Sequence, residues 1–152
     1  MDLAALTRPE LIFPDLGTGG RSEPNVLQEL SARVAAVGAV PDGGELAARL
    51  AEREALGSTG VGGGVAIPHC KLSGISRAIL AIGIAPEGVE FRAVDGLPVR
   101  LFFLVVSPSQ SPAEHLQVLA AISRWVRAPG RIEKVLVAGS PAAIFDLLQK
   151  GS

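Results

Sequence analysis

Residues 99–106 read Val99-Arg100-Leu101-Phe102-Phe103-Leu104-Val105-Val106, an apolar run of strand length that a single charged residue interrupts. A second run, Ala78-Ile79-Leu80-Ala81-Ile82-Gly83-Ile84-Ala85, precedes it, and Pro and Gly bound both runs. Nearly continuous apolar runs of this length are typical of strands that are covered on both faces. The two runs therefore predict the centre of a sheet that lies between two other layers.

Helical patterns lie on both sides of these runs. Apolar spacing and helix start and stop residues predict helices at residues 23–37, 42–56, 112–127, 131–138 and 141–150. Gly38 and Gly57 follow the first two segments as stop residues. Because helices precede and follow the buried strands, we expect an α/β fold, a three-layer αβα sandwich with a mixed β-sheet.

Shorter segments are expected to complete the sheet. Leu11-Ile12-Phe13 predicts a first short strand, and the Gly-rich residues 17–20 predict a loop after it. Residues 88–91 can form a short edge strand, and residues 94–97 can form a turn before the run at 99–106. The Gly-rich residues 57–64 are expected to form a loop.

The chain of 152 residues has the length of one ordinary domain that buries its own core. Its 14 basic and 15 acidic residues leave no basic surface of the kind that binds nucleic acid or anionic lipid. No apolar run is long enough to cross a membrane, so we expect no direct membrane insertion. One cysteine excludes an internal disulfide, and the N-terminus lacks the pattern of a signal peptide. We therefore expect a soluble, cytoplasmic protein whose partners are proteins or small molecules.

His69 is one of only two histidines and follows the Gly-rich residues 57–64. A neutral imidazole can accept a proton or a phosphoryl group near pH 7, so a histidine behind a flexible stretch is a candidate reactive group. Pro68 restricts Ile67 to extended geometry, which predicts a strand that presents His69 on one side. The alternative is an ordinary surface histidine.

His115, the other histidine, is expected in the first turn of a helix. The preceding Ser111-Pro112-Ala113-Glu114 has the pattern of a capping box with Pro at the first helical position. The amides and the dipole of a first turn attract anions, which together with His69 suggests chemistry on phosphate. At about 100° per residue, His115 falls on the inward face with Leu119 and Ile122. The alternative is a core histidine that hydrogen-bonds to a backbone carbonyl.

Arg53 falls on the inward face of its predicted helix, beside Leu46 and Leu50. A guanidinium that is always charged needs an anionic partner or a route to solvent at such a place. The alternative is a side chain that extends to solvent from the end of the helix. The hydroxyls of Ser58 and Thr59 can donate hydrogen bonds to a phosphate, although capping or turn formation explains them equally well.

Other kinds of site fit the sequence less well. Cys70 next to His69 suggests a thiol protease, but adjacent side chains of a strand point to opposite faces. The Gly-rich residues 57–64 lack the Gly-Lys-Ser/Thr ending of a P-loop and the glycine spacing of a dinucleotide site. Two histidines and one cysteine without a paired ligand motif favour no metal site.

Taken together, these features resemble the enzyme IIA domain of the mannitol and fructose class of the bacterial sugar phosphotransferase system, including its nitrogen-regulatory members. The resemblance covers residues 6–149 as a single domain. It rests on Arg53-Glu54, Gly57-Ser58-Thr59-Gly60, Gly64-Val65-Ala66-Ile67-Pro68-His69, the strand from Pro98 to Val106, and Glu114-His115-Leu116. Residues 68–72 and 91–99 look more like the nitrogen-regulatory and fructose branches than the mannitol branch.

The resemblance implies a phosphotransferase that forms a phosphohistidine and uses no cofactor or metal. His69 would accept a phosphoryl group from a histidine-containing phosphocarrier protein and pass it to a IIB-type partner in sugar uptake, with Arg53 and His115 in supporting positions. The alternative is a regulatory binding module in which the phosphorylation state of His69 controls partner proteins. Cys70 stands where the family usually has glycine. Lys71 is expected outside the site, because the chain can already be turning there.

Overall fold

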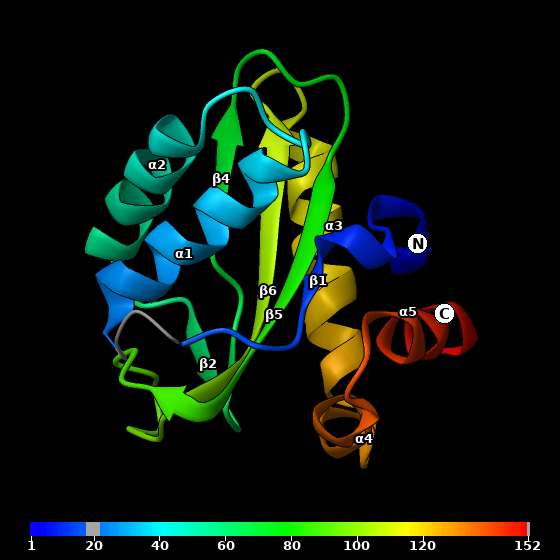
Figure 1. Ribbon diagram of the computed structural model, residues 1–152. Helices are drawn as coiled ribbons and strands as arrows, with labels where there is room; N and C mark the ends of the chain where they lie inside the picture. The colour runs from blue at the N-terminus through cyan, green and yellow to red at the C-terminus, as the bar shows by residue number, and fades with distance from the viewer. Residues whose placement is uncertain (18–21, 152) are drawn as a thin grey trace.

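One mixed sheet forms the centre of the computed structural model, which describes residues 1–17 and 22–151 (Figure 1). Its strands are β1 (Ile12–Phe13), β2 (Gly60–Gly62), β3 (Val65–Ala66), β4 (His69–Leu72), β5 (Ile79–Val89) and β6 (Val99–Pro108). The strand order is β1-β5-β6-β3-β2, and β4 also pairs with β6. The two longest strands, β5 and β6, are those that the apolar runs predict.

Helices cover both faces of this sheet (Figure 1). On one face lie α1 (Glu23–Ala36) and α2 (Gly43–Ala55), and on the other lie α3 (Pro112–Val126), α4 (Arg131–Ala138) and α5 (Pro141–Lys150). The predicted three-layer αβα sandwich with a mixed sheet is therefore confirmed. Two short 3-10 helices, η1 (Leu3–Leu6) and η2 (Pro9–Leu11), precede β1, and the apolar patterns do not predict them.

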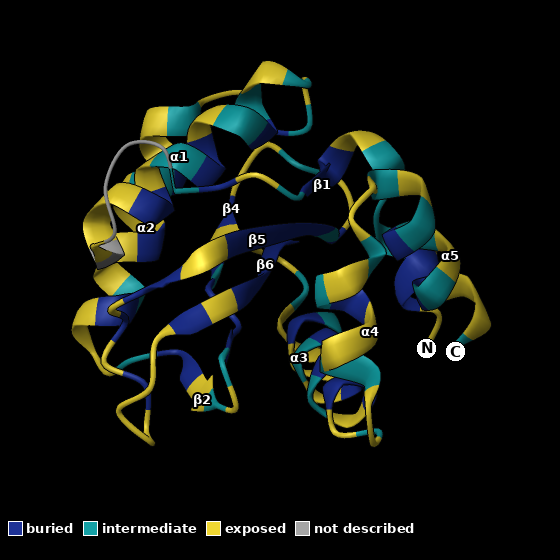
Figure 2. Ribbon diagram, turned by 60° about the horizontal axis from the view of Figure 1, so that its bottom comes forward, coloured by how far each residue is buried: buried dark blue, intermediate teal, exposed yellow. Residues whose placement is uncertain are grey.

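The side chains of β6 explain why this strand is apolar along nearly its whole length. Leu101, Phe103 and Val105 pack into the core beneath α3 to α5. The residues between them, Phe102 and Leu104, pack into the core beneath α1 and α2. Each side chain of this size stabilises the fold by about 1.5–3 kcal/mol when it is fully buried. Figure 2 shows the resulting buried centre, in which β5 and β6 are dark blue along most of their length between the two helical layers.

The neighbours of β6 determine where the sheet places His69. On one edge of β6 runs the antiparallel strand β5, and on the other edge lie β3 and then β4, both parallel to β6. Pro68 separates β3 from β4, because it has no N–H to donate to a neighbouring strand. Its carbonyl oxygen still accepts from the N–H of Val105 at 2.9 Å. His69 therefore starts β4, opposite Val105.

The predicted edge strand at residues 88–91 is wrong. Gly88 and Val89 belong to β5 itself, and Val89 pairs with Val99 of the central strand. The register shifts between Ile84 and Val89, because the intervening residues form an irregularity in which Gly88 takes a φ of +84°. The extra residues lengthen one bent strand and do not start a new one.

The Gly-rich residues 57–64, predicted as a loop, contain a strand. β2 pairs antiparallel with β3 and forms a small hairpin at the edge of the sheet. Gly63 and Gly64 make the turn at φ values of +68° and +82°, which side-chain-bearing residues rarely adopt. The sequence does not predict this hairpin, because strands are normally recognised by β-branched and aromatic residues and this segment consists mostly of glycine.

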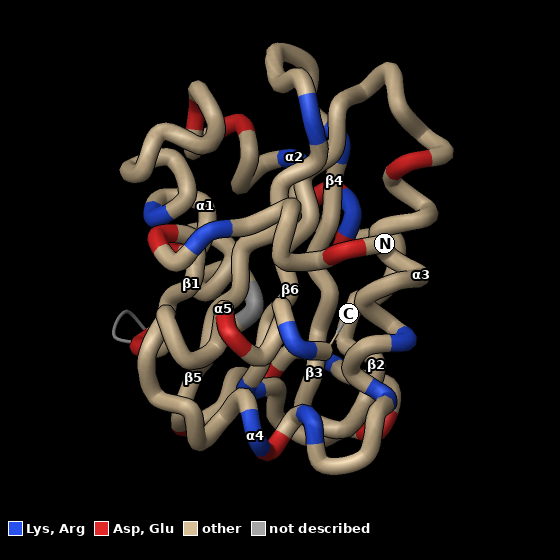
Figure 3. The backbone as a smooth tube through the Cα atoms, turned by 90° about the vertical axis from the view of Figure 1, so that its right-hand side faces the viewer, with Lys and Arg blue, Asp and Glu red and all other residues tan. Residues whose placement is uncertain are grey.

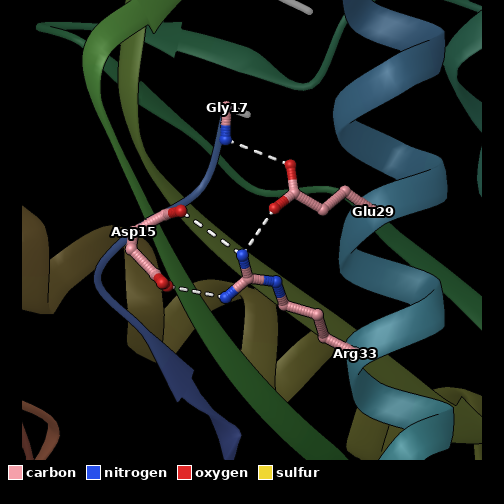
Figure 4. Close-up of polar contacts among 4 residues, drawn as sticks. All are labelled: Asp15, Gly17, Glu29 and Arg33. Carbon is pink, nitrogen blue, oxygen red and sulfur yellow. Dashed lines mark hydrogen bonds and ion pairs between the residues drawn. The ribbon is translucent and has the colours of Figure 1, made fainter. Parts of the chain in front are cut away.

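Arg33 on α1 ties the first helical layer to the chain that follows β1 (Figure 4). Its guanidinium contacts Oδ1 of Asp15 at 2.6 Å and Oε2 of Glu29 at 2.7 Å. Glu29 also accepts from the backbone N–H of Gly17 at 3.0 Å. A network of this kind holds geometry better than an isolated surface pair. It keeps α1 over the β1 side of the sheet.

Charged residues of both signs are interspersed along the chain in the view of Figure 3, as the near balance of basic and acidic residues predicts. Within residues 1–17 and 22–151, no helix has both the length and the apolar character needed to cross a membrane.

Candidate active site

A cavity of about 560 Å³ opens where the end of α2, the start of β4 and the first turns of α3 meet. It brings together the three residues that the sequence pointed to, Arg53, His69 and His115. Its other lining residues are Arg49, Glu52, Leu56, Cys70, Lys71, Leu116 and Leu119. The cavity therefore combines two imidazoles, three cations, one carboxylate and three leucines.

The two ring nitrogens of His69 have different partners. Nδ1 lies 2.7 Å from the carbonyl oxygen of Ile67, and Nε2 lies 3.2 Å from Nε of Arg53. A carbonyl oxygen can only accept, so the imidazole proton resides on Nδ1 and the lone pair resides on Nε2. Burial lowers the pKa of His69, an effect that the nearby Arg53 cation reinforces and the hydrogen bond to Ile67 opposes. His69 is therefore neutral and nucleophilic at pH 7.

Arg53 reaches this site from the last turn of α2. Leu46 and Leu50, on the same side of the helix, are fully buried, so the helix presents this face to the sheet. The guanidinium also donates to the carbonyl oxygen of Gly57 at 2.8 Å. Among the described residues, Arg53 forms no ion pair with a carboxylate. Its charge is thus available to an anion bound in the cavity.

Ser58 and Thr59 do not line the cavity. The hydroxyl of Ser58 donates to the carbonyl oxygen of Phe91 at 2.7 Å. Thr59 donates both its hydroxyl and its backbone N–H to the buried carboxylate of Glu54. These bonds hold the loop that carries Gly57, and with it the guanidinium of Arg53. The structure thus gives both hydroxyls protein partners.

His115 is 6% exposed, and its imidazole lies tilted against that of His69, with 5.4 Å between the ring centroids. Its Nδ1 lies 2.7 Å from the hydroxyl oxygen of Ser107. Burial, followed by the charges of His69 and Lys71, lowers the pKa of His115 to about 4. The inward orientation predicted from the helix wheel is confirmed, and the ring is neutral at pH 7.

The predicted capping box at the start of α3 is wrong, although Ser111 and Pro112 do begin the helix. The side chain of Ser111 makes no capping bond. Its backbone N–H already donates to the carbonyl oxygen of Pro108 at 3.1 Å, so Glu114 has no N–H to accept from there. The preceding turn therefore positions His115, and the side-chain box does not.

Two residues of the site were missed or misplaced by the sequence analysis. Lys71 was expected outside the site, but β4 continues to Leu72, so Lys71 shares the side of His69 and lines the cavity. The two-residue period of a strand is the signal that could have placed it. Ser107 has no such signal, because only the packing of α3 on β6 brings it to His115.

Cys70 points away from the His69 side of β4 and joins the core beneath α1 and α2. Burial raises the pKa of its thiol to about 12, which leaves almost no thiolate at pH 7. The arrangement does not support a thiol nucleophile. Across residues 1–17 and 22–151, no three His, Cys, Asp or Glu side chains gather into a group that could hold a metal ion.

The stability of the fold is expected to decrease as the pH falls from about 6.5 to about 4. In this window the unfolded chain protonates His115 and the folded chain does not, so acid favours unfolding by at most about 1.4 kcal/mol per pH unit from this residue. His115→Gln should flatten the profile. Urea unfolding at several pH values measures both slopes, and equal slopes would contradict a buried neutral imidazole.

The whole chain is similar to proteins of one known family. The family model described as the phosphoenolpyruvate-dependent sugar phosphotransferase system, EIIA 2, matches residues 5–151. The PTS system fructose-specific EIIA component of Haloferax volcanii is 33% identical over 147 residues, which cover 97% of this chain and 94% of that protein. A nitrogen regulatory protein of Bradyrhizobium diazoefficiens is 34% identical over 148 residues, with 97% and 95% covered. The crystal structure of nitrogen regulatory protein IIA-Ntr from Neisseria meningitidis aligns with a TM-score of 0.86 at 29% identity, covering 95% of this chain and 97% of that one.

Proposed function

Because this chain belongs to the EIIA 2 family of the phosphoenolpyruvate-dependent sugar phosphotransferase system, we propose that it is a phosphocarrier whose phosphoryl group is carried on Nε2 of His69. The 2.7 Å contact between Nδ1 and the carbonyl oxygen of Ile67 carries this assignment. It holds the proton on Nδ1 and leaves the Nε2 lone pair beside Arg53 in the cavity.

The first transfer is an exchange of one P–N bond for another. The Nε2 lone pair of His69 attacks the phosphorus of a phosphohistidine on a small phosphocarrier protein. The donor P–N bond breaks, and its electron pair remains on the donor nitrogen. In the second transfer the thiolate of a IIB-type partner attacks the same phosphorus, and the electron pair of the P–N bond returns to Nε2.

Charge stabilisation comes from the groups around Nε2. A transferring phosphoryl group spreads its negative charge over three equatorial oxygens, and catalysis is mostly positioning and charge stabilisation. Arg53 can turn its N–H groups from Nε2 to one of these oxygens. Lys71 adds a second cation on the same side of β4, and the neutral ring of His115 can donate a hydrogen bond.

Two roles of the phosphorylated protein are compatible with the relatives. We propose onward transfer to a IIB-type domain in sugar uptake, supported by the fructose-specific relative. The alternative, a regulatory module whose phosphorylation state controls a partner protein, is supported by the nitrogen regulatory relatives. Both use the same phosphorylated His69. Onward transfer to a IIB domain supports the first, and phosphorylation-dependent binding without onward transfer supports the second.

Labelling with phosphoenolpyruvate tests the proposed carrier role. The protein is incubated with the general phosphotransferase components and phosphoenolpyruvate, and the acid-labile adduct is mapped by mass spectrometry under alkaline conditions. We expect one phosphoryl group on the peptide that contains His69. An adduct on a different residue would refute the assignment.

Lys71→Ala is expected to slow phosphoryl acceptance by about threefold to tenfold, because it removes an exposed and partly screened cation next to the bound group. Lys134→Ala on α4, at an exposed position that does not line the cavity, is the matched control and should retain the wild-type rate. Rapid-quench labelling measures both variants. If the two variants behave alike, Lys71 does not act on the phosphoryl group.

A further inference from the structure

We propose that Ser107 is a positioning residue for phosphoryl transfer: in the phosphorylated protein its hydroxyl donates to Nδ1 of His115, which holds the imidazole proton on Nε2 toward the phosphoryl group. This inference rests on the proposed function of His69. Ser107 acts only through His115 and does not itself touch the group that is transferred.

The hydrogen bond between the side chains of Ser107 and His115 is short and buried. Ser107 on β6 is fully buried, and its hydroxyl oxygen lies 2.7 Å from Nδ1 of His115. Ser107 pairs with Lys71 across β4 and β6, so it lies next to a residue that lines the cavity. With Nδ1 directed to this buried hydroxyl, Nε2 is the nitrogen that remains for the cavity side of the ring.

The protonation state of His115 makes the choice of nitrogen important. With its pKa lowered to about 4, the ring carries one proton near pH 7. If that proton is on Nδ1, it is donated to Ser107 and a lone pair faces the cavity. If it is on Nε2, the ring can donate a hydrogen bond to a phosphoryl oxygen.

A phosphoryl group on His69 selects between these two forms. The ring centroids are 5.4 Å apart, so the oxygens of that group come close to the imidazole of His115. A lone pair facing anionic oxygens is repelled, whereas an N–H is attracted. The proton therefore occupies Nε2, and the buried Nδ1 lone pair then needs a donor. A hydroxyl can donate or accept, so Ser107 satisfies Nδ1 before and after phosphorylation.

Nitrogen-15 NMR of the imidazole rings tests this inference, since the nitrogen shifts identify the protonated nitrogen. In the phosphorylated wild type, we expect His115 to carry its proton on Nε2. Ser107→Ala should lower the share of this tautomer and shift the phosphoryl equilibrium toward the donor protein on the order of tenfold, the effect of leaving a buried acceptor unsatisfied. Ser31→Ala is the matched control, because Ser31 is equally buried and its hydroxyl has no hydrogen-bond partner among the described residues.

Two results would overturn the role of Ser107. One is a proton on Nδ1 of His115 in the phosphorylated wild type. The other is a Ser107→Ala variant that matches Ser31→Ala in both tautomer and equilibrium. Either result with normal labelling of His69 refutes the role of Ser107 alone, whereas absence of label on wild-type His69 refutes the proposed function as well.

Discussion

His69→Ala is expected to abolish phosphoryl acceptance, with a loss of at least about three orders of magnitude in rate. The reason is the absence of a substitute nucleophile in the cavity. His115 is only 6% exposed, whereas His69 is half-buried, and the thiol of Cys70 has a pKa of about 12 and points away from the His69 side of β4. Labelling from phosphoenolpyruvate, followed over time, measures the loss.

Cys70→Ala is the matched control for this variant, since it changes the next residue of the same strand. It should keep the wild-type labelling rate, because its side chain packs beneath α1 and α2 and contributes no thiolate. Circular dichroism and thermal melting confirm that both variants fold. Persistent labelling of a folded His69→Ala protein would remove His69 from the role of acceptor.

Replacement of Arg53 has the second largest expected effect. Arg53→Lys and Arg53→Gln should slow phosphoryl transfer by about 10²- to 10³-fold, as removal of a preorganised donor does in other charge-stabilising sites. A lysine supplies charge without the planar fork, and a glutamine supplies donors without charge. Melting temperatures should stay within about 3 °C of wild type, because the guanidinium is only partly buried at a helix end.

The control for Arg53 is Arg49→Gln, one turn earlier on the same helix. Arg49 also lines the cavity, but its guanidinium faces Glu52 at 4.0 Å, whereas the guanidinium of Arg53 donates to His69. Its variant should transfer within a few-fold of the wild-type rate. If Arg53→Lys instead loses much stability while its folded fraction transfers normally, Arg53 is a structural residue.

The fold was largely predictable because its strongest signals are local. An apolar run such as residues 99–106 is typical of a strand covered on both faces, and the alternation of Phe103 and Phe102 between the two cores confirms this structure. The edge of the sheet was not predictable in the same way. β2 consists of glycine and valine, and β5 continues through an irregularity before Val89, so neither has the alternation that identifies a strand.

In the candidate site as well, residues with a local sequence signal were predictable and residues placed only by packing were not. His69 and His115 stood out by rarity and by their neighbours, and Arg53 stood out as a charge beside buried leucines. Ser107 could not be identified from the sequence, because it lies on an apolar strand and gains its meaning from a helix that packs across it. Lys71 was misplaced because the length of β4 depends on its pairing with β6, which residues 69–72 do not reveal on their own.

The linkage of the phosphoryl group tests the central claim most directly. Two-dimensional proton–nitrogen and phosphorus NMR of the phosphorylated protein, labelled with nitrogen-15, distinguishes phosphorus on Nε2 from phosphorus on Nδ1. Because Nδ1 of His69 donates to the carbonyl oxygen of Ile67, we predict a phosphohistidine at residue 69 that is bonded through Nε2, with the Nδ1 proton retained. Phosphorus bonded to Nδ1 of His69, or to any other residue, would contradict it.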